Sequence, residues 1–294
     1  MATLFKTLTT PAHEKPDAEK PKSRILILSS RGVTYRHRHL LQDLVAMLPH
    51  SRKDAKLDTK NNLHYLNEVA ELYNCNGVLF FEARKRQDLY IWMSRVPNGP
   101  CVKFHVHNLH TMSELNFTGN ALKGSRAIVS FDKNFDLQPS SALIKELLLH
   151  TFSVPKGARK SKPFIDRVVN FTLADGKVWV RHFQIQVSSV KEKKDDDEKA
   201  KDKETTELVE IGPRFVLTPI VILEGSFGGP KVYENREFVS PNAVRREIRD
   251  RKAVRASGRD GQRIKRSVKK KEVAREQAVA KQMEREIDDA MLFA

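Results

Sequence analysis

The sequence predicts an α/β protein made of two similar halves, with a disordered leader before them and a basic, largely helical tail after them. Two observations predict this class. Apolar runs of the buried-strand type alternate with segments of helical periodicity. The pattern also starts twice, because at 24–29 and again at 126–130 an arginine precedes an apolar run that ends in serine. The expected parts are therefore a leader (1–22), two halves (23–125 and 126–239) and a tail (240–294).

The first half is expected to contain four strands and two helices. Leu40, Leu44 and Leu48 recur at helical spacing, and Pro49 ends that helix. A second amphipathic helix is expected over 60–74. The strands are the apolar runs at 25–28, 78–81, 89–93 and 101–106.

The second half is expected to contain one helix, at 142–152, and the strands 126–131, 167–174, 177–187 and 214–223. Asp175-Gly176 is a hairpin signal between the two middle strands. Pro219 lies inside the last strand, where it cannot donate a ladder hydrogen bond, so we expect an edge position or a bulge there. Acidic and basic residues dominate 191–207, which predicts a disordered insertion.

The tail begins with a helix-start signal, since Ser240 can cap a helix that has Pro241 in its first turn. Gly258 and Gly261 are expected to interrupt that helix. We therefore expect helical pieces rather than one continuous helix.

The formal net charge of +16 over 294 residues points to nucleic acid or another polyanion as a partner. Membrane lipid is less favoured, because no basic helix carries a continuous bulky apolar face. No apolar run approaches the ~20 residues of a membrane span. Cys75 and Cys101 show no paired spacing, so we expect reduced thiols in a soluble intracellular protein.

Cations and aromatic rings are concentrated after the first strand, where few acids lie nearby. Arginine pairs with phosphate bidentately, and tyrosine or histidine rings can stack on unpaired bases. We therefore favour RNA or DNA contact over an ordinary solvated face. The candidates in this segment are Arg31, Tyr35, Arg36, His37, Arg38, His39, Arg52 and Lys53.

Two further basic segments add candidates. In the loop after the second-half helix, RNA contact and an ordinary basic loop are equally favoured; its cations are Lys156, Arg159, Lys160 and Lys162. The tail segment fits both a nuclear-localisation signal and a helical arm in a nucleic-acid groove. Its candidates are Arg263, Lys265, Arg266, Lys269, Lys270 and Lys271.

No motif argues for catalysis or for a bound cofactor. The glycine-rich segment 224–231 lacks the lysine–hydroxyl pair and the following helix of a phosphate-binding loop, so a structural turn is expected. His105, His107 and His110 are close in sequence, but no cysteine or carboxylate pair completes a ligand set. We expect no metal site.

Three runs resemble the Brix-domain family of ribosome-assembly factors: 27–32 (ILSSRG), 35–44 (YRHRHLLQDL) and 211–215 (IGPRF). The resemblance extends over about 24–242. It implies two halves that each resemble the anticodon-binding domain of class II aminoacyl-tRNA synthetases. It also makes Arg214, in the Gly-Pro-Arg turn, a further RNA-binding candidate.

The resemblance further implies precursor ribosomal RNA as the ligand, a nucleolar location and no enzymatic activity. We therefore expect a non-catalytic assembly factor of the large (60S) ribosomal subunit. Other assembly factors of the pre-60S particle, including one dedicated protein partner, are the expected protein contacts. The alternative is a protein–protein scaffold whose basic loops bind an acidic partner.

Overall fold

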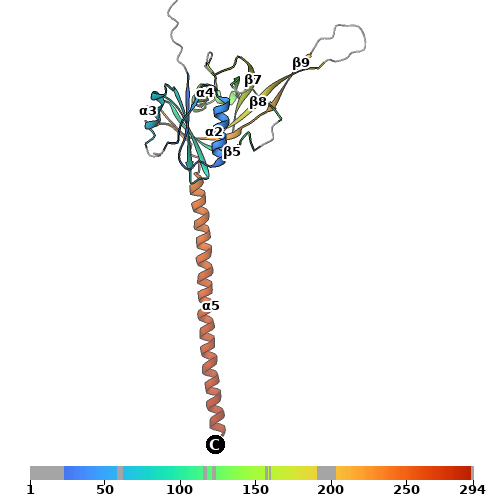
Figure 1. Cartoon of the computed structure of the whole chain (residues 1–294). Helices are drawn as coiled ribbons and strands as arrows, with labels where there is room; N and C mark the ends of the chain where they lie inside the picture. Colours follow the sequence, from blue (N-terminus) through green and yellow to red (C-terminus); the bar gives the residue numbers. More distant parts are fainter. Residues whose placement is uncertain are drawn as a thin grey trace, which may run out of the picture. The chain divides into compact units, whose positions relative to one another are not determined.

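The computed structural model of the protein describes residues 23–57, 62–114, 118–120, 124–155, 158, 160–190 and 203–292. The predicted α/β class is confirmed, because one large sheet forms the body and helices pack against it (Figure 1). The chain up to Arg236 and the chain from Glu237 onward form two compact units. The predicted leader and residues 191–202 of the predicted insertion lie outside the described residues.

One side of the sheet contains three parallel strands. β1 (Ile25–Ser29) lies between β2 (Ser51–Lys53) and β3 (Gly77–Arg84). Parallel neighbours need crossover connections, which α2 (Tyr35–Met47) and α3 (Tyr65–Leu72) supply. β4 (Asp88–Arg95) and β5 (Cys101–His110) extend the sheet in antiparallel pairs.

The other side of the sheet has a similar arrangement. β6 (Arg126–Phe131) is parallel to β7 (Ile165–Ala174), and η1 (Lys133–Asp136) and α4 (Pro139–Phe152) connect them. β8 (Lys177–Val190) and β10 (Arg214–Leu223) follow in antiparallel pairs. Because β10 also pairs with β5, one sheet runs through both predicted halves, in the order β2-β1-β3-β4-β5-β10-β8-β7-β6. The division at residue 126 stays a prediction.

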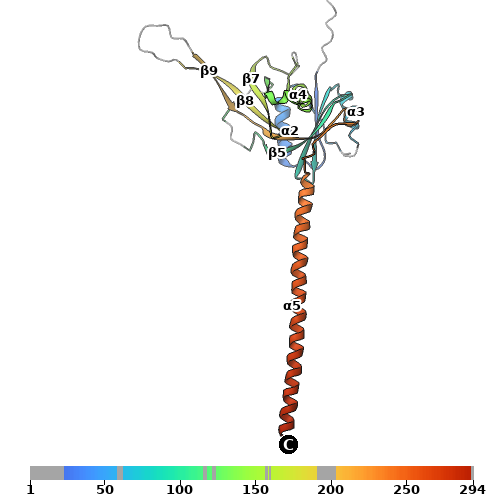
Figure 2. The same cartoon turned by 180° about the vertical axis from the view of Figure 1, so that it is seen from behind.

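Two apolar cores lie on opposite faces of the first strands. Neighbouring strand residues point to opposite faces, so Ile25 and Ile27 join the core beneath α2 and α4, whereas Leu26 and Leu28 join the core beneath α3. The view from behind shows α2 close to α4, with α3 apart from both (Figure 2). Cys75 and Cys101 are free and buried, as expected of reduced thiols, and burial raises the pKa of the Cys101 thiol to about 12.

A buried arginine ties α2 to the second part of the sheet. Arg167 of β7 is 3% exposed and donates to the Met47 carbonyl at 2.9 Å. The same guanidinium donates to Ser125 Oγ at 2.8 Å and to the Ser125 carbonyl at 2.6 Å. Met47 is the last residue of α2, and carbonyls at a helix end have no partner within the helix. Arg167 therefore supplies the missing donor at the end of this helix.

The structure corrects two expectations about the body. The helix indicated by Leu40, Leu44 and Leu48 begins earlier than that leucine repeat, at Tyr35 after the Thr34 cap, so the basic residues at 35–39 belong to α2 rather than to a loop before it. Residues 203–207, predicted as disordered, belong to β9 (Lys203–Glu210), which pairs with the end of β8 as a two-stranded ribbon (Figure 1). A further strand that was not predicted, β11 (Lys231–Glu234), pairs with β10.

The bulge expected at Pro219 is confirmed. The register of β10 against β5 shifts between Pro219 and Val221, and the described pairing of β10 with β8 covers only Phe215 to Leu217. The missing amide hydrogen of the proline therefore falls where the ladder is already interrupted.

The C-terminal unit corrects one more expectation. α5 (Pro241–Leu292) is a single helix of 52 residues that continues through Gly258 and Gly261. Within the described ranges, no helix is both long enough and apolar enough to cross a membrane.

Candidate nucleic-acid interface

Three parallel strands end at one edge of the sheet, and hydrogen bonds hold their ends together. The Ser30 amide donates to the Phe81 carbonyl at 2.8 Å, and the Ala83 amide donates to Ser30 Oγ at 2.9 Å. On the other side of β1, the Leu57 amide donates to the Ser29 carbonyl at 2.9 Å. Ser30 is fully buried, so its hydroxyl is part of the sheet's construction. The segments after β1, β2 and β3 consequently emerge side by side.

Exposed cations occupy each of these three segments. They form the edge cluster, whose members are Arg31, Lys53, Lys56, Lys85 and Arg86. Arg31 follows β1, Lys53 ends β2, and Lys85 lies in the turn from β3 to β4. Lys85 and Arg86 have φ angles of 50° and 55°, a region that favours glycine or asparagine, yet both positions carry cations. Sequence reasoning missed these two residues, although a run of basic residues between two predicted strands was visible.

The start of α2 strengthens the positive potential beside the edge cluster. The first turn of α2 contains no acidic residue, and the amide ends of a helix carry partial positive charge. Arg38 is exposed, and within the described ranges its guanidinium has no ion pair. Tyr35 is 69% exposed, and its ring centroid lies 4.0 Å from that of His39. An anion approaching this helix end would meet donors and an open ring.

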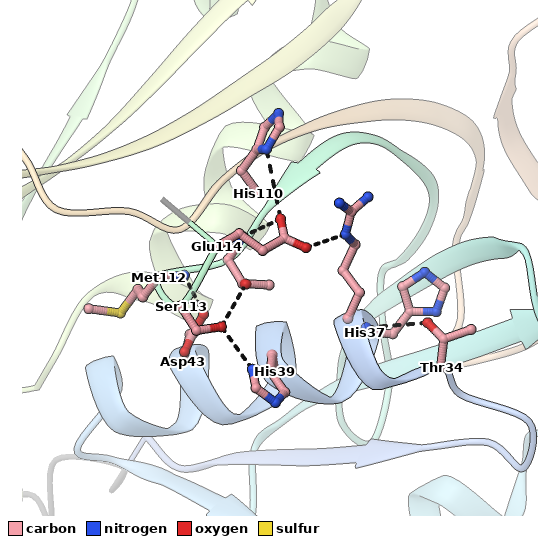
Figure 3. A network of polar contacts seen from close by, with 10 residues as sticks. Thr34, His37, His39, Asp43, His110, Met112, Ser113 and Glu114 are labelled. Atoms are coloured by element: carbon pink, nitrogen blue, oxygen red, sulfur yellow. Dashed lines mark hydrogen bonds and ion pairs between the residues drawn. The ribbon is translucent and has the colours of Figure 1, made fainter. Parts of the chain in front are cut away.

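A polar network attaches α2 to the turn after β5 (Figure 3). Glu114 pairs with the Arg36 guanidinium and lies 3.8 Å from His110 Nδ1. The His39 ring nitrogen Nδ1 lies 2.9 Å from Ser113 Oγ, and Asp43 accepts the Met112 amide at 3.0 Å. Arg36 is therefore partly neutralised in the free protein, in contrast to Arg38.

Not every predicted residue of this segment faces solvent. His37 is buried, and burial followed by the charge of Arg36 lowers the pKa of its imidazole, so it stays neutral and does not belong to the contact surface. Arg52 is exposed, but its guanidinium stacks 3.8 Å from the centre of the Tyr73 ring. The charge of Arg52 can still attract a phosphate, but one face of its guanidinium is already covered by the Tyr73 ring.

The loop after α4 lies elsewhere on the sheet. Lys162 donates its amide to the Gly124 carbonyl at 2.7 Å, next to the amino end of β6. Lys160 and Lys162 are exposed there, whereas Arg31 follows the carboxyl end of β1. Lys156 and Arg159 lie outside the described residues.

A small pocket brings Arg214 together with other polar side chains. Its volume is about 200 Å³, and its lining includes Asn108, His110, Trp179, Arg181, Arg214 and Val216. Arg214 lies 3.7 Å from Glu210 and follows a turn in which the Pro213 carbonyl accepts a hydrogen bond from His182 Nδ1 at 2.7 Å. Burial lowers the pKa of His182 to about 4, so this imidazole is a neutral donor. His110 joins the pocket to the network of Figure 3.

In the C-terminal unit, the six predicted cations lie on α5 and are all exposed: Arg263, Lys265, Arg266, Lys269, Lys270 and Lys271. A helix with cations around it can follow a phosphate backbone without reading sequence.

The described residues contain no group of three or more histidine, cysteine or acidic side chains able to hold a metal ion. His105 and His107 instead hydrogen-bond each other at 2.8 Å. The glycine-rich segment packs inward, with Phe227 buried in the core beneath α3 and Ser226 Oγ 2.7 Å from Ser94 Oγ. It serves as a structural turn.

Comparisons with known proteins identify the family of this chain. The family model described as the Brix domain matches residues 30–221. "Ribosome biogenesis protein BRX1" of Saccharomyces cerevisiae is 55% identical over 280 residues, which cover 92% of this chain and 95% of the yeast protein. "Ribosome biogenesis protein brx1" of Schizosaccharomyces pombe is 59% identical over 248 residues, with 84% and 81% covered. "Ribosome biogenesis protein BRX1 homolog" of Homo sapiens is 50% identical over 246 residues, with 84% and 65% covered. The chain belongs to the Brix-domain family.

Proposed function

We propose that this protein is a non-catalytic ribosome assembly factor that binds precursor ribosomal RNA of the large subunit. Its relatives are named as ribosome biogenesis proteins, which supports a role in ribosome assembly. The observation that carries RNA binding is the edge cluster, in which five exposed cations from three chain segments meet at the end of three parallel strands. Each phosphate that such a cation neutralises releases condensed counterions, which drives binding and makes it depend on salt.

The arrangement favours contact with the RNA backbone over the reading of sequence. Hydrogen bonds between the strand ends hold the backbone segments that carry the edge cluster side by side, so these segments are positioned before RNA arrives. Phosphate contacts of this kind position an RNA without specifying its bases. We propose that the protein holds a folded RNA segment in one arrangement while processing and later protein joining proceed. The expected location for such a role is the nucleolus, within the pre-60S particle.

The test is RNA affinity measured against salt concentration. Replacing Arg31, Lys53 and Lys85 together by alanine removes one cation from each segment of the edge cluster and should weaken binding to a structured precursor-rRNA fragment. The slope of log K against log salt should fall by about 0.7–0.9 for each phosphate that the variant no longer neutralises. A matched control replaces Lys133, Lys177 and Lys231, three exposed cations that are not RNA-binding candidates, which removes equal charge outside the edge cluster. An unchanged affinity and slope in the first variant would refute the assigned surface.

A protein-scaffold role is the second candidate, and the β8–β9 ribbon favours it. Val187 and Leu208 are 61% and 55% exposed, and Leu208 pairs with Ile185 on the same face of the ribbon as Val187. An exposed apolar stripe of this kind suits a partner protein. Crosslinking to RNA in cells distinguishes the two roles, because a pure scaffold would be recovered with RNA only through its partner.

A further inference from the structure

The Arg214 pocket combines three kinds of group that recognise one ligand. Its volume of about 200 Å³ is below the range of about 300–1,000 Å³ typical for drug-sized ligands, so it suits a small planar group. The half-buried Trp179 ring provides a flat surface, and Asn108 provides an amide. Arg181 and Arg214 provide two guanidinium groups at the same place.

The indole of Trp179 carries a donor without an acceptor. Its Nε1 atom is buried, and no described residue accepts its hydrogen. Because this atom is buried, a ligand in the pocket cannot reach it, and the indole face is the part of Trp179 that can contact a ligand. A nucleobase can stack on such a face, whereas a bare phosphate would leave it unused.

The cations of the pocket are only partly neutralised. Arg181 is exposed and has no ion pair within the described ranges. Arg214 is held by the Gly-Pro-Arg turn, which His182 anchors, and its separation of 3.7 Å from Glu210 is longer than a charge-assisted hydrogen bond. Phosphates on either side of a bound base could therefore replace that weak contact.

We propose that this pocket receives one unpaired nucleobase of the bound RNA, with the neighbouring phosphates paired to Arg181 and Arg214. The inference rests on the proposed RNA-binding function and adds to it a site for a single unstacked nucleotide. Stacking on an aromatic ring and pairing with arginine are the usual means of holding single-stranded RNA. Through His110 and Glu114 the pocket adjoins Arg36, so a strand could continue from it toward α2.

The two tryptophans of the chain allow a direct test. Trp92 is 8% exposed and donates to Glu82 at 2.8 Å, so it reports on the core, whereas Trp179 reports on the pocket. A short single-stranded oligoribonucleotide should change the emission of the full-length protein in a saturable manner. The change should persist in Trp92→Phe and disappear in Trp179→Phe.

Affinity provides the second measurement. Trp179→Ala should weaken binding of the same oligoribonucleotide by about 5- to 150-fold, the range for loss of one stacked base. Arg181→Gln should weaken it more than Lys177→Gln, a change of equal charge on the same strand outside the pocket. Thermal unfolding of each variant shows whether a loss of affinity comes from a loss of folding. Trp179→Phe keeps an aromatic ring in the pocket, so it should weaken binding less than Trp179→Ala does.

The outcomes separate this inference from the proposed function. Binding seen by anisotropy without any Trp179 signal would overturn the pocket and leave RNA binding intact. An equal Trp179 response to a duplex of the same sequence would overturn the requirement for an unpaired base. Absence of binding to every RNA would refute both proposals.

Discussion

Replacing Glu114 with glutamine should tighten RNA binding, although the change removes an ion pair. Glu114 holds the Arg36 guanidinium, and Arg36 must leave this carboxylate before it can contact a phosphate. Glutamine has nearly the same shape and keeps an acceptor for the Thr111 amide, which lies 3.4 Å from Glu114 Oε2. The turn that carries residue 114 should therefore stay in place.

The exposure of the two side chains sets the size of the effect. They are 56% and 27% exposed, and surface pairs of this kind contribute about 0.2–1 kcal/mol. Releasing Arg36 from the pair should raise affinity for a structured precursor-rRNA fragment by about 1.4- to 5-fold. If the freed guanidinium then contacts one phosphate, the salt slope should steepen by about 0.7–0.9.

Fluorescence anisotropy with a labelled fragment, repeated over a series of KCl concentrations, measures both quantities. The variants needed are Glu114→Gln, Arg36→Gln and the double substitution, because a double-mutant cycle isolates the coupling between the two residues. The gain from Glu114→Gln should vanish when Arg36 is already replaced. Weaker binding by Glu114→Gln, at unchanged unfolding free energy, would refute the reasoning and show that the carboxylate positions Arg36 for RNA.

Three further predictions concern the framework that presents the interface. Ser30→Ala should lower the free energy of unfolding in urea by about 1–3 kcal/mol, because the buried Ala83 amide loses its acceptor, whereas the exposed Ser130→Ala should stay within about 0.5 kcal/mol. Arg167→Met should cost roughly 2–6 kcal/mol in the same assay, since the Met47 and Ser125 carbonyls both lose a donor, and a loss below about 1 kcal/mol would contradict the bridging role. Burial lowers the pKa of His182 from 6.5 to about 4, so the unfolded chain binds the proton first. The stability that neutral His182 contributes is complete above pH 6.5. That contribution should fall by up to about 1.4 kcal/mol per pH unit as the pH drops toward 4. His182→Asn, which keeps a donor amide, should reduce that slope without abolishing it because the pKa of His50 is lowered to about 4 as well; an unchanged slope would exclude His182 as a contributor.

β1, β3 and the two helices could be predicted because each carries a strong local signal, whereas β2, a strand of three residues, was missed because it has no apolar run. β3 is a continuous apolar run, and α2 repeats leucine at helical spacing. β9 has no such signal, because half of its residues are charged and its pairing with β8 decides its conformation. In α5, two glycines that each cost about 1 kcal/mol lie among many good helix formers, which outweigh them.

The candidate interface could be assembled from sequence only where its residues are neighbours along the chain. Arg31 and Arg38 were identified from one dense segment, but Lys85 and Arg86 join them only through the parallel pairing of β1 and β3. Trp179 and Arg181 had no distinguishing local pattern, and the pairing of β10 with β8 brings them to Arg214. Local spacing predicts single elements, whereas a site assembled across strands depends on register.

The pairing of β5 with β10 has a mechanical consequence. Eight residue pairs join these two strands in the middle of the sheet. Moving the edge cluster relative to β8 would therefore require breaking backbone hydrogen bonds at the centre of the body. An RNA that reaches both the edge cluster and the Arg214 pocket must match a fixed separation, since the protein cannot close around it. Simultaneous engagement multiplies affinity, so an RNA with the matching fold binds more tightly than one that reaches a single point. The body would then retain an RNA segment that has folded to the matching separation and release one that has not.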